Sequence, residues 1–290
     1  MSYSNYEQSV FFDGFKLSGV QSVAGSYSIN EKAINVAGFG FVDSIVSAPM
    51  QGDFSFNRKM VSFDPILRTN SIGKYLYDEN EFDGAIAYNN DSNGFGFTRG
   101  RVNRYSVTCS VGEIPDIQTN ITVYGQLGKD VIDYDNYITE DHPEIKFIDQ
   151  SSIKLSVSDF DIDAISDFSY TRSISLNPVY ALGNGDASDW NQNYTDSQNL
   201  EPVQVDTTYP IETDINFTMI ANKYEIKKIA DRLAASEESD VKIEICDAVD
   251  NNNIVNSFTG INMKLMSEGI NSSTEDELSI SMSYKGFETL

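Results

Sequence analysis

Apolar and polar residues alternate at every second position along much of this chain. The alternation is clear in Gly52–Phe56, Tyr105–Val111, Asn120–Tyr124, Thr213–Met219 and Leu278–Tyr284, and turn-forming Gly, Asn, Asp and Ser residues bound the runs. Because a strand directs successive side chains to opposite faces, this period indicates strands with one buried face. The sequence therefore predicts a mainly β, antiparallel protein.

Two segments depart from the strand period and predict helices. Asn222–Glu238 has apolar residues at helical spacing, and Asn222 with Glu225 can form a capping box at its start. In Ser62–Tyr77, Asp64 precedes a proline and can cap a shorter helix. Each half of the chain is therefore expected to carry one flanking helix.

The two halves of the sequence match one another in order. Residues 16–17 match residues 154–155, residues 20 and 23 match 162 and 165, and residues 53–56 match 214–217. The separation grows before the last match, which indicates an insertion at 184–203, a polar stretch with no strand or helix period. We expect two tandem β-sandwich or barrel domains, 1–128 and 151–290, joined by an acidic connector at 129–150.

Charge excludes several classes of protein. The chain has 20 Lys and Arg against 44 Asp and Glu, a net charge of -24, which would repel nucleic-acid phosphates. No apolar run approaches the roughly 18 residues of a membrane span, so no membrane partner is expected. Cys109 and Cys246 lie in alternating segments and are expected to be buried, reduced thiols.

Few residues offer catalytic or metal chemistry. His142 is the only histidine, so one chain holds no His-based triad or multi-histidine metal site. Asp159, Asp161 and Asp163 have the spacing that begins a calcium loop, but Ala164 and Tyr170 occupy its Gly and Glu positions. We expect no enzyme activity, metal or cofactor, with paired carboxylates for glycoside hydrolysis as an open alternative.

In each half, the order of strand, loop, strand, helix and hairpin resembles the tail tube protein fold of tailed bacteriophages and related contractile injection machines. The resemblance rests on Arg172–Gly183, Glu201–Met219 and the helix at Asn222, and in the first half on Ile34–Gly40, Ala48–Met50, the 53–56 strand and the Asp64 helix start. The insertion in the second half and the duplication itself depart from most members of that family.

The resemblance implies a structural virion protein of a phage tail, made in the host cytoplasm. Neighbouring sheets would join into a ring around a channel that conducts DNA without binding it specifically, and three tandem chains would form a pseudo-sixfold ring. An acidic wall would keep DNA off the surface. The implied partners are further copies of the chain, in the ring and in stacked rings, and other tail proteins such as the baseplate hub, sheath or tape measure.

The stretch from Ser173 to Asn222 contains no Lys, Arg or His. Its candidate interface or lumen residues are Asp186, Asp189, Trp190, Asp196, Glu201 and Asp206. A solvated acidic loop without a function explains the same residues. Two alternatives for the whole chain are a trimeric baseplate hub or tube-initiating adaptor of the same fold, and a monomeric carbohydrate-binding β-sandwich module with an exposed aromatic platform.

Overall fold

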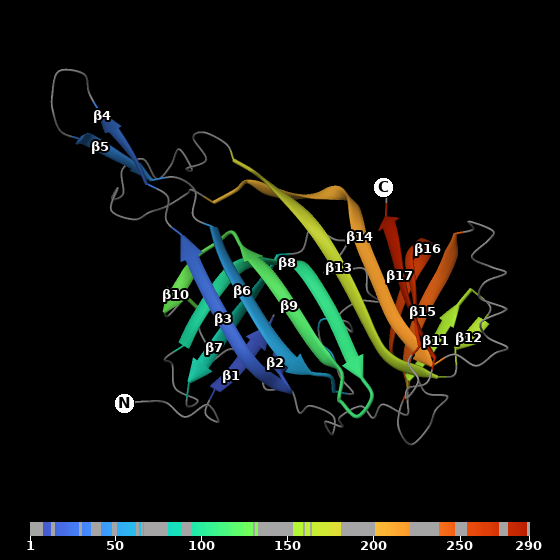
Figure 1. The fold of residues 1–290 in the computed structure, drawn as a ribbon. Coiled ribbons are helices and arrows are strands. Elements are labelled where there is room, and N and C mark those ends of the chain that lie inside the picture. The colour runs from blue at the N-terminus through green and yellow to red at the C-terminus, as the bar shows by residue number, and fades with distance from the viewer. Residues whose placement is uncertain are drawn as a thin grey trace.

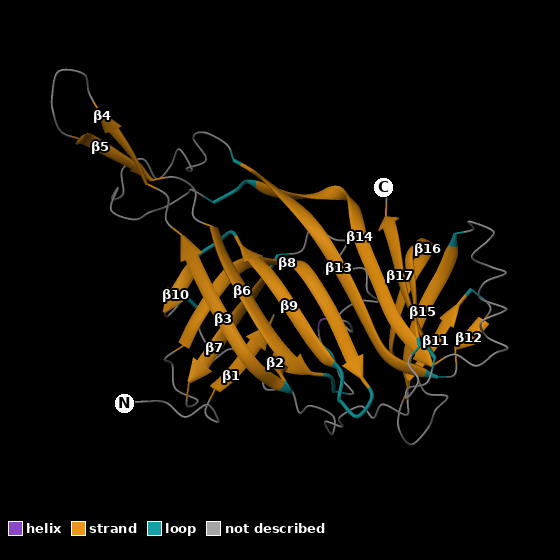
Figure 2. Cartoon of the chain, viewed as in Figure 1, coloured by secondary structure: helices purple, strands orange, loops and turns teal. Residues whose placement is uncertain are grey.

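The computed structural model describes residues 8–12, 15–28, 31–35, 42–47, 51–61, 64, 66, 81–88, 94–129, 131–132, 153–158, 160–162, 164–180, 201–220, 238–246, 254–272 and 278–288. The strands are β1 Gln8–Phe12, β2 Phe15–Leu17, β3 Val20–Ser28, β4 Glu31–Asn35, β5 Val42–Ser47, β6 Gln51–Lys59, β7 Phe82–Tyr88, β8 Gly94–Ser110, β9 Asp116–Val123, β10 Leu127–Lys129, β11 Ile153–Val157, β12 Phe160–Ile162, β13 Ile165–Val179, β14 Gln204–Ile220, β15 Ser239–Cys246, β16 Ile254–Asn271 and β17 Ser279–Glu288. Figures 1 and 2 show these strands in place.

The described part of the chain confirms the mainly β prediction. Fifteen strands form one sheet, and every pairing in it is antiparallel. In β6, Gly52, Phe54 and Phe56 are buried while Gln51 and Asp53 are exposed. The two-residue alternation thus correctly indicates strands with one buried face. β4 and β5 form a separate antiparallel hairpin that projects from the main sheet (Figure 1).

The same pairing order occurs twice along the chain. The first half has the order β2-β1-β7-β8-β9-β6-β3, and the second has β12-β11-β15-β16-β17-β14-β13. β8 and β16 have the same place in each series, because the first part of each pairs with β7 or β15 and the last part with β9 or β17. A bulge interrupts the ladder at three equivalent places in each half. In the first half they are Val20/Ser22, Phe82/Gly84 and Val102/Arg104. The equivalent bulges in the second half are Ile165/Asp167, Ser239/Val241 and Leu265/Ser267, in the same order.

One local backbone conformation is also shared by the two halves. Arg99 and Asn262 have positive φ angles of 55° and 52° at equivalent places in β8 and β16. The backbone N–H of Arg99 donates to Asp83, and that of Asn262 donates to Asp240, over 3.2 and 2.8 Å. A positive φ angle is uncommon in residues other than glycine. Its recurrence with the same aspartate hydrogen bond therefore supports the structural equivalence of β8 and β16.

The pairing corrects the alignment of the first matched strands. Val23 lies opposite Phe56 in β6, and Phe168 lies opposite Phe217 in β14. The equivalent of Val23 is therefore Phe168, so the predicted match to Ile165 is wrong by three residues. Isolated Val and Ile residues recur along every alternating strand, so they do not determine register without the hydrogen-bonded partner.

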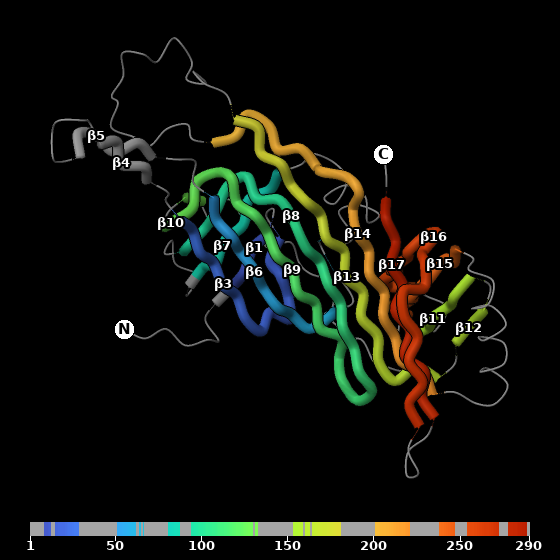
Figure 3. The backbone as a smooth tube through the Cα atoms, turned by 45° about the horizontal axis from the view of Figure 1, so that its top comes forward, coloured from blue at the N-terminus to red at the C-terminus, as the bar shows by residue number. Residues whose placement is uncertain are grey.

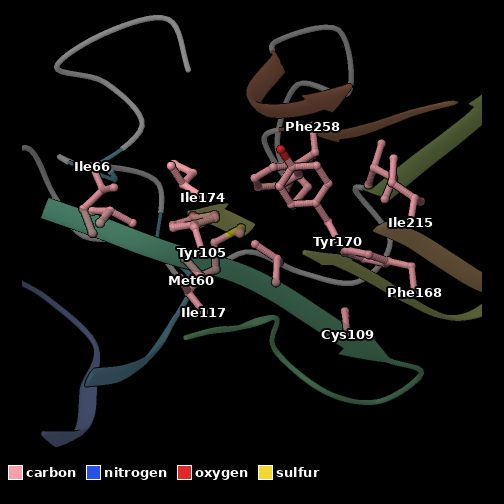
Figure 4. Close-up of a cluster of buried hydrophobic side chains, with 14 of the residues drawn as sticks. Met60, Ile66, Tyr105, Cys109, Ile117, Phe168, Tyr170, Ile174, Ile215 and Phe258 are labelled. Carbon is pink, nitrogen blue, oxygen red and sulfur yellow. The ribbon is translucent and has the colours of Figure 1, made fainter. Parts of the chain in front are cut away.

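The two halves join through β8 and β13, which pair from Ser110 opposite Asp167 to Arg104 opposite Ser173. This joint makes a continuous run of eight strands, β3-β6-β9-β8-β13-β14-β17-β16, visible side by side in Figures 1 and 3. The core crosses the joint as well, because the Phe258 ring of β16 lies 5.0 Å from that of Tyr170 and 6.4 Å from that of Tyr105 (Figure 4).

Several predicted elements lie outside the described residues. These are the Asn222–Glu238 helix except Glu238, most of Ser62–Tyr77, most of the 129–150 connector, and 184–200 of the insertion. Asp64 is described, and its Oδ1 accepts a 2.9 Å bond from the backbone N–H of Ile66, the bond that a capping residue makes. The division into two tube-like domains with flanking helices stays a prediction. Within the described segments, no helix is long and apolar enough to cross a membrane.

Candidate functional site

Charged side chains reinforce the joint between the halves. Arg101 donates from Nη1 to the backbone carbonyl of Val205 and from Nη2 to Thr207 Oγ1 over 3.2 Å. Arg99 pairs with Glu81 at 2.6 Å and with Glu201 at 3.0 Å. Hydrogen bonding to Glu81 raises the pKa of Arg99, although partial burial opposes the shift. The joint thus combines sheet pairing, a shared core, the hydrogen bonds of Arg101 and the ion pair of Arg99 with Glu201.

The two ends of the eight-strand run are open edges. β3 pairs only with β6, and Lys264–Asn271 of β16 pairs only with β17, among the described strands. An open edge carries backbone N–H and C=O groups without strand partners and can accept another strand. We call β3 and Lys264–Asn271 the open edges.

Equivalent residues differ sharply in exposure between the joint and the open edges. Val107 of β8 lies opposite Ile117, and Ile270 of β16 lies opposite Ile280, the equivalent position. Val107 is 0% exposed, whereas Ile270 is 60% exposed. On the other side of the joint, Arg172 of β13 is 1% exposed, whereas its equivalent in β3, Tyr27, is 53% exposed. The open edges therefore expose positions that the joint covers.

The open edge β3 lacks the usual protection against pairing. Proteins blunt edges with lysine, proline or very short strands. β3 spans nine residues, VQSVAGSYS, with neither a charge nor a proline. At the other limits of the sheet, by contrast, β2 and β12 are three residues each. The composition of β3 suits a strand that pairs with a partner.

One face of the eight-strand run is mainly polar, although Phe287 and Ile220 lie on it near its ends. Register places one row across seven strands, composed of Ser22, Asn57, Gln118, Ser106, Thr171, Asp214 and Lys285. Asn216 Nδ2 donates to Ser169 Oγ over 3.1 Å on the same face. The row on the opposite face includes buried Phe56, Tyr105 and Arg172. The polar face offers hydroxyl and amide groups with no aromatic surface in this row.

Charges on the polar face are few and partly paired. Its carboxylates are Asp53, Asp116, Asp167, Glu212 and Asp214, and its bases are Lys59, Arg104, Lys264 and Lys285. Lys59 pairs with Asp116 at 2.7 Å, and Lys285 with Glu212 at 2.9 Å. The acid excess of the chain is therefore not concentrated on this face.

Two arginines are buried on the opposite face. Arg58 is 0% exposed and pairs with the equally buried Asp64, whose Oδ2 also accepts a 2.9 Å bond from the Tyr105 hydroxyl. Burial, followed by the nearby Asp64 charge, raises the pKa of Tyr105 well above its usual value. Arg172 makes two bonds to the Glu288 carboxylate, of 2.5 and 2.7 Å. Both arginines are held by charge-assisted hydrogen bonds.

The structure describes two of the six predicted interface or lumen residues. Glu201 pairs with Arg99 at the joint, and Asp206 lies on β14, where its carboxylate accepts a bond from Gln204. Asp186, Asp189, Trp190 and Asp196 lie outside the described residues. Glu201 therefore contributes to a contact between the halves of one chain.

Sequence reasoning missed the buried arginines and the open edges. A signal for the arginines was present, because Arg58 follows Phe54 and Phe56 at alternate positions and Arg172 follows Phe168 and Tyr170 in the same way. The same parity places them on the buried face. The open edges had no such signal, since exposure of a strand edge depends on which neighbours exist.

Both cysteines are free and buried. Burial, with smaller effects of Glu113 and Asp116, raises the pKa of Cys109 from 9.0 to about 11. Since the thiolate is the reactive species, its fraction near pH 8 falls about 100-fold. We expect iodoacetamide to alkylate Cys109 at least about 100-fold more slowly in the folded chain than in urea, as measured by peptide mass spectrometry. Equal rates would show that Cys109 is accessible.

Comparison with protein-family models and with curated proteins finds no match to this chain. The described residues contain no group of three or more His, Cys, Asp or Glu side chains that could hold a metal ion. The described strands define a class: an antiparallel β protein with a joint between its halves and a second, equivalent pair of edges to which no other described strand is paired.

Proposed function

We propose that the chain is a self-assembling structural protein that forms a trimeric, pseudo-sixfold ring of a bacteriophage tail tube and conducts DNA. The observation that carries the proposal is the pair of open edges. Each chain already joins one half to the other through β8 and β13, and the equivalent strands β16 and β3 have no further partner among the described strands. Repeating the joint between chains would close the ring if each joint turns the sheet by about 60°.

The polar face suits the wall of a channel for DNA. Hydroxyl and amide groups offer neither the clustered cations that bind phosphates nor the aromatic rings on which bases stack. The remaining charges favour acids slightly, so the face repels DNA weakly. In this proposal the two halves are tandem tube-like domains, and further rings and other tail proteins contact the ring above and below.

A trimeric hub or tube-initiating adaptor would use the same ring once per particle. No contact of the described residues favours the hub over the tube, since the two differ in stacking. A carbohydrate-binding module is the proposal from another class, and Trp190, its only tryptophan, lies outside the described residues.

Purified full-length chain tests the proposal. We expect light scattering at micromolar concentration to give a mass three times the 32.3 kDa of the chain, or multiples of it. Electron micrographs should show rings with a central hole, stacked into filaments for a tube and single for a hub. A gel-shift assay near 0.15 M salt should show no DNA binding. A strict monomer at high concentration, or tight DNA binding, would overturn the proposal.

A further inference from the structure

The joint between the halves has a defined register. Tyr170 of β13 lies opposite Val107 of β8, and Ser169 lies opposite Thr108. The surrounding ladders relate each of these residues to one in the open edges. Tyr170 lies opposite Ile215, as Gly25 lies opposite Phe54 in the first half, and residues 53–56 correspond to 214–217. Gly25 therefore occupies the place of Tyr170 on an open edge.

The second open edge is related to β8 in the same way. Val107 and Thr108 lie opposite Ile117 and Asp116 in β9, and Ile270 and Asn271 lie opposite Ile280 and Ser279 in β17. The bulges at Val102/Arg104 and Leu265/Ser267 also precede Val107 and Ile270 by the same number of residues. Ile270 therefore occupies the place of Val107, and Asn271 that of Thr108.

We propose that a second copy of this chain adds its β3 antiparallel to β16, with Gly25 opposite Ile270, Ala24 opposite Asn271 and Tyr27 opposite Glu268. The inference rests on the proposed function and specifies the site and register of its self-association. Backbone bonds along the edges supply adhesion, and side-chain packing selects this register over slipped ones.

The side chains at this register are complementary in size. A Cβ atom added to Gly25 would lie 3.1 Å from Cδ2 of Phe54 and 3.2 Å from Cε1 of Phe95, so both rings already pack closely against the glycine and leave little room for a side chain on this edge. Ile270 is 60% exposed on the opposite edge. Cross-strand neighbours approach within about 5.5 Å, so Ile270 of the second copy would pack beside Gly25, which has no side chain to compete for that space. At the joint within the chain, the large residue is instead on β13 and the smaller one on β8.

Engineered cysteine pairs test the register. One variant carries Gly25→Cys and Ile270→Cys, and a second carries Ala24→Cys and Asn271→Cys. Adjacent opposite pairs alternate between hydrogen-bonded and closer non-hydrogen-bonded positions, so the two variants sample both geometries. The control, Gly25→Cys with Glu268→Cys, is two residues out of register, where diagonal neighbours lie about 7–8 Å apart. Native Cys109 and Cys246 are buried and stay in all variants.

After mild oxidation, we expect at least one in-register variant to give dimers and trimers on non-reducing denaturing gels, in at least 10-fold greater yield than the control, and reducing agent to reverse them. Equal or greater cross-linking of the control, or none in either in-register variant, would overturn the proposed register. If the register is overturned but the unsubstituted chain still forms rings under the same conditions, the proposed function stands without the proposed register. An unsubstituted chain that is strictly monomeric would overturn both.

Discussion

An Ile270→Lys variant is expected to stay folded and to be monomeric at concentrations where the unsubstituted chain assembles. Ile270 is 60% exposed in the isolated chain, so lysine is tolerated there. In an assembled edge the position becomes equivalent to Val107, which is 0% exposed. Burying an unpaired ammonium costs several kcal/mol, and every 1.4 kcal/mol is a factor of ten in affinity. Association should weaken by at least about 100-fold, as measured by sedimentation velocity.

Ile261→Lys is the matched control for this variant. Ile261 is also on β16 and is 66% exposed, but it lies outside the open edge Lys264–Asn271. We expect it to assemble with an affinity within a few-fold of the unsubstituted chain. Circular dichroism should give the same melting transition for both variants. Normal assembly of Ile270→Lys would show that this edge is not the interface.

An Asp64→Ala variant is expected to lose about 3–5 kcal/mol of unfolding free energy, because it leaves the buried Arg58 without its carboxylate. It also removes the acceptor of the Tyr105 hydroxyl and of the Ile66 backbone N–H. Nε and Nη1 of Arg58 already lack acceptors among the described residues, so no alternative bond compensates. Urea unfolding followed by circular dichroism measures the loss.

Asp116→Ala is the control for the buried pair. Asp116 also binds a basic residue, Lys59, but the two side chains are 45% and 31% exposed. Solvent screens such pairs, so the expected loss is at most about 1 kcal/mol. The double variant Arg58→Met, Asp64→Leu should regain most of the stability lost by Asp64→Ala, because it removes both buried charges. Similar losses for Asp64→Ala and Asp116→Ala would contradict the importance of burial.

Sequence periodicity predicted the strands well because alternation is a local property. The hairpins formed by β8 with β9 and by β16 with β17 were also predictable, since their strands are adjacent in sequence. Register between the halves was not, and the predicted match of Val23 to Ile165 shows why. Apolar residues repeat along any half-buried strand, so the correct equivalent, Phe168, is identified only by its partner Phe217.

The candidate site was harder to predict than the fold. The predicted interface residues were mainly acids of the insertion, whereas the candidate interface in the structure includes β3, a strand without any charge. Whether a strand edge is open depends on contacts between residues far apart in sequence, such as Cys109 with Phe168 at the joint. No local pattern distinguishes the covered residue Val107 from the exposed residue Ile270, since both are β-branched residues in long strands.

The pairing of β8 with β13 has a further consequence, because both strands belong to the same polypeptide. That joint forms within one molecule, so dilution does not weaken it, whereas the proposed pairing of β3 with β16 of a second chain would depend on the concentration of free chains. In a ring of three chains, joints that resist dilution alternate with joints that do not. Dissociation then releases whole chains with the first joint intact, and one substitution such as Ile270→Lys changes three of the six joints.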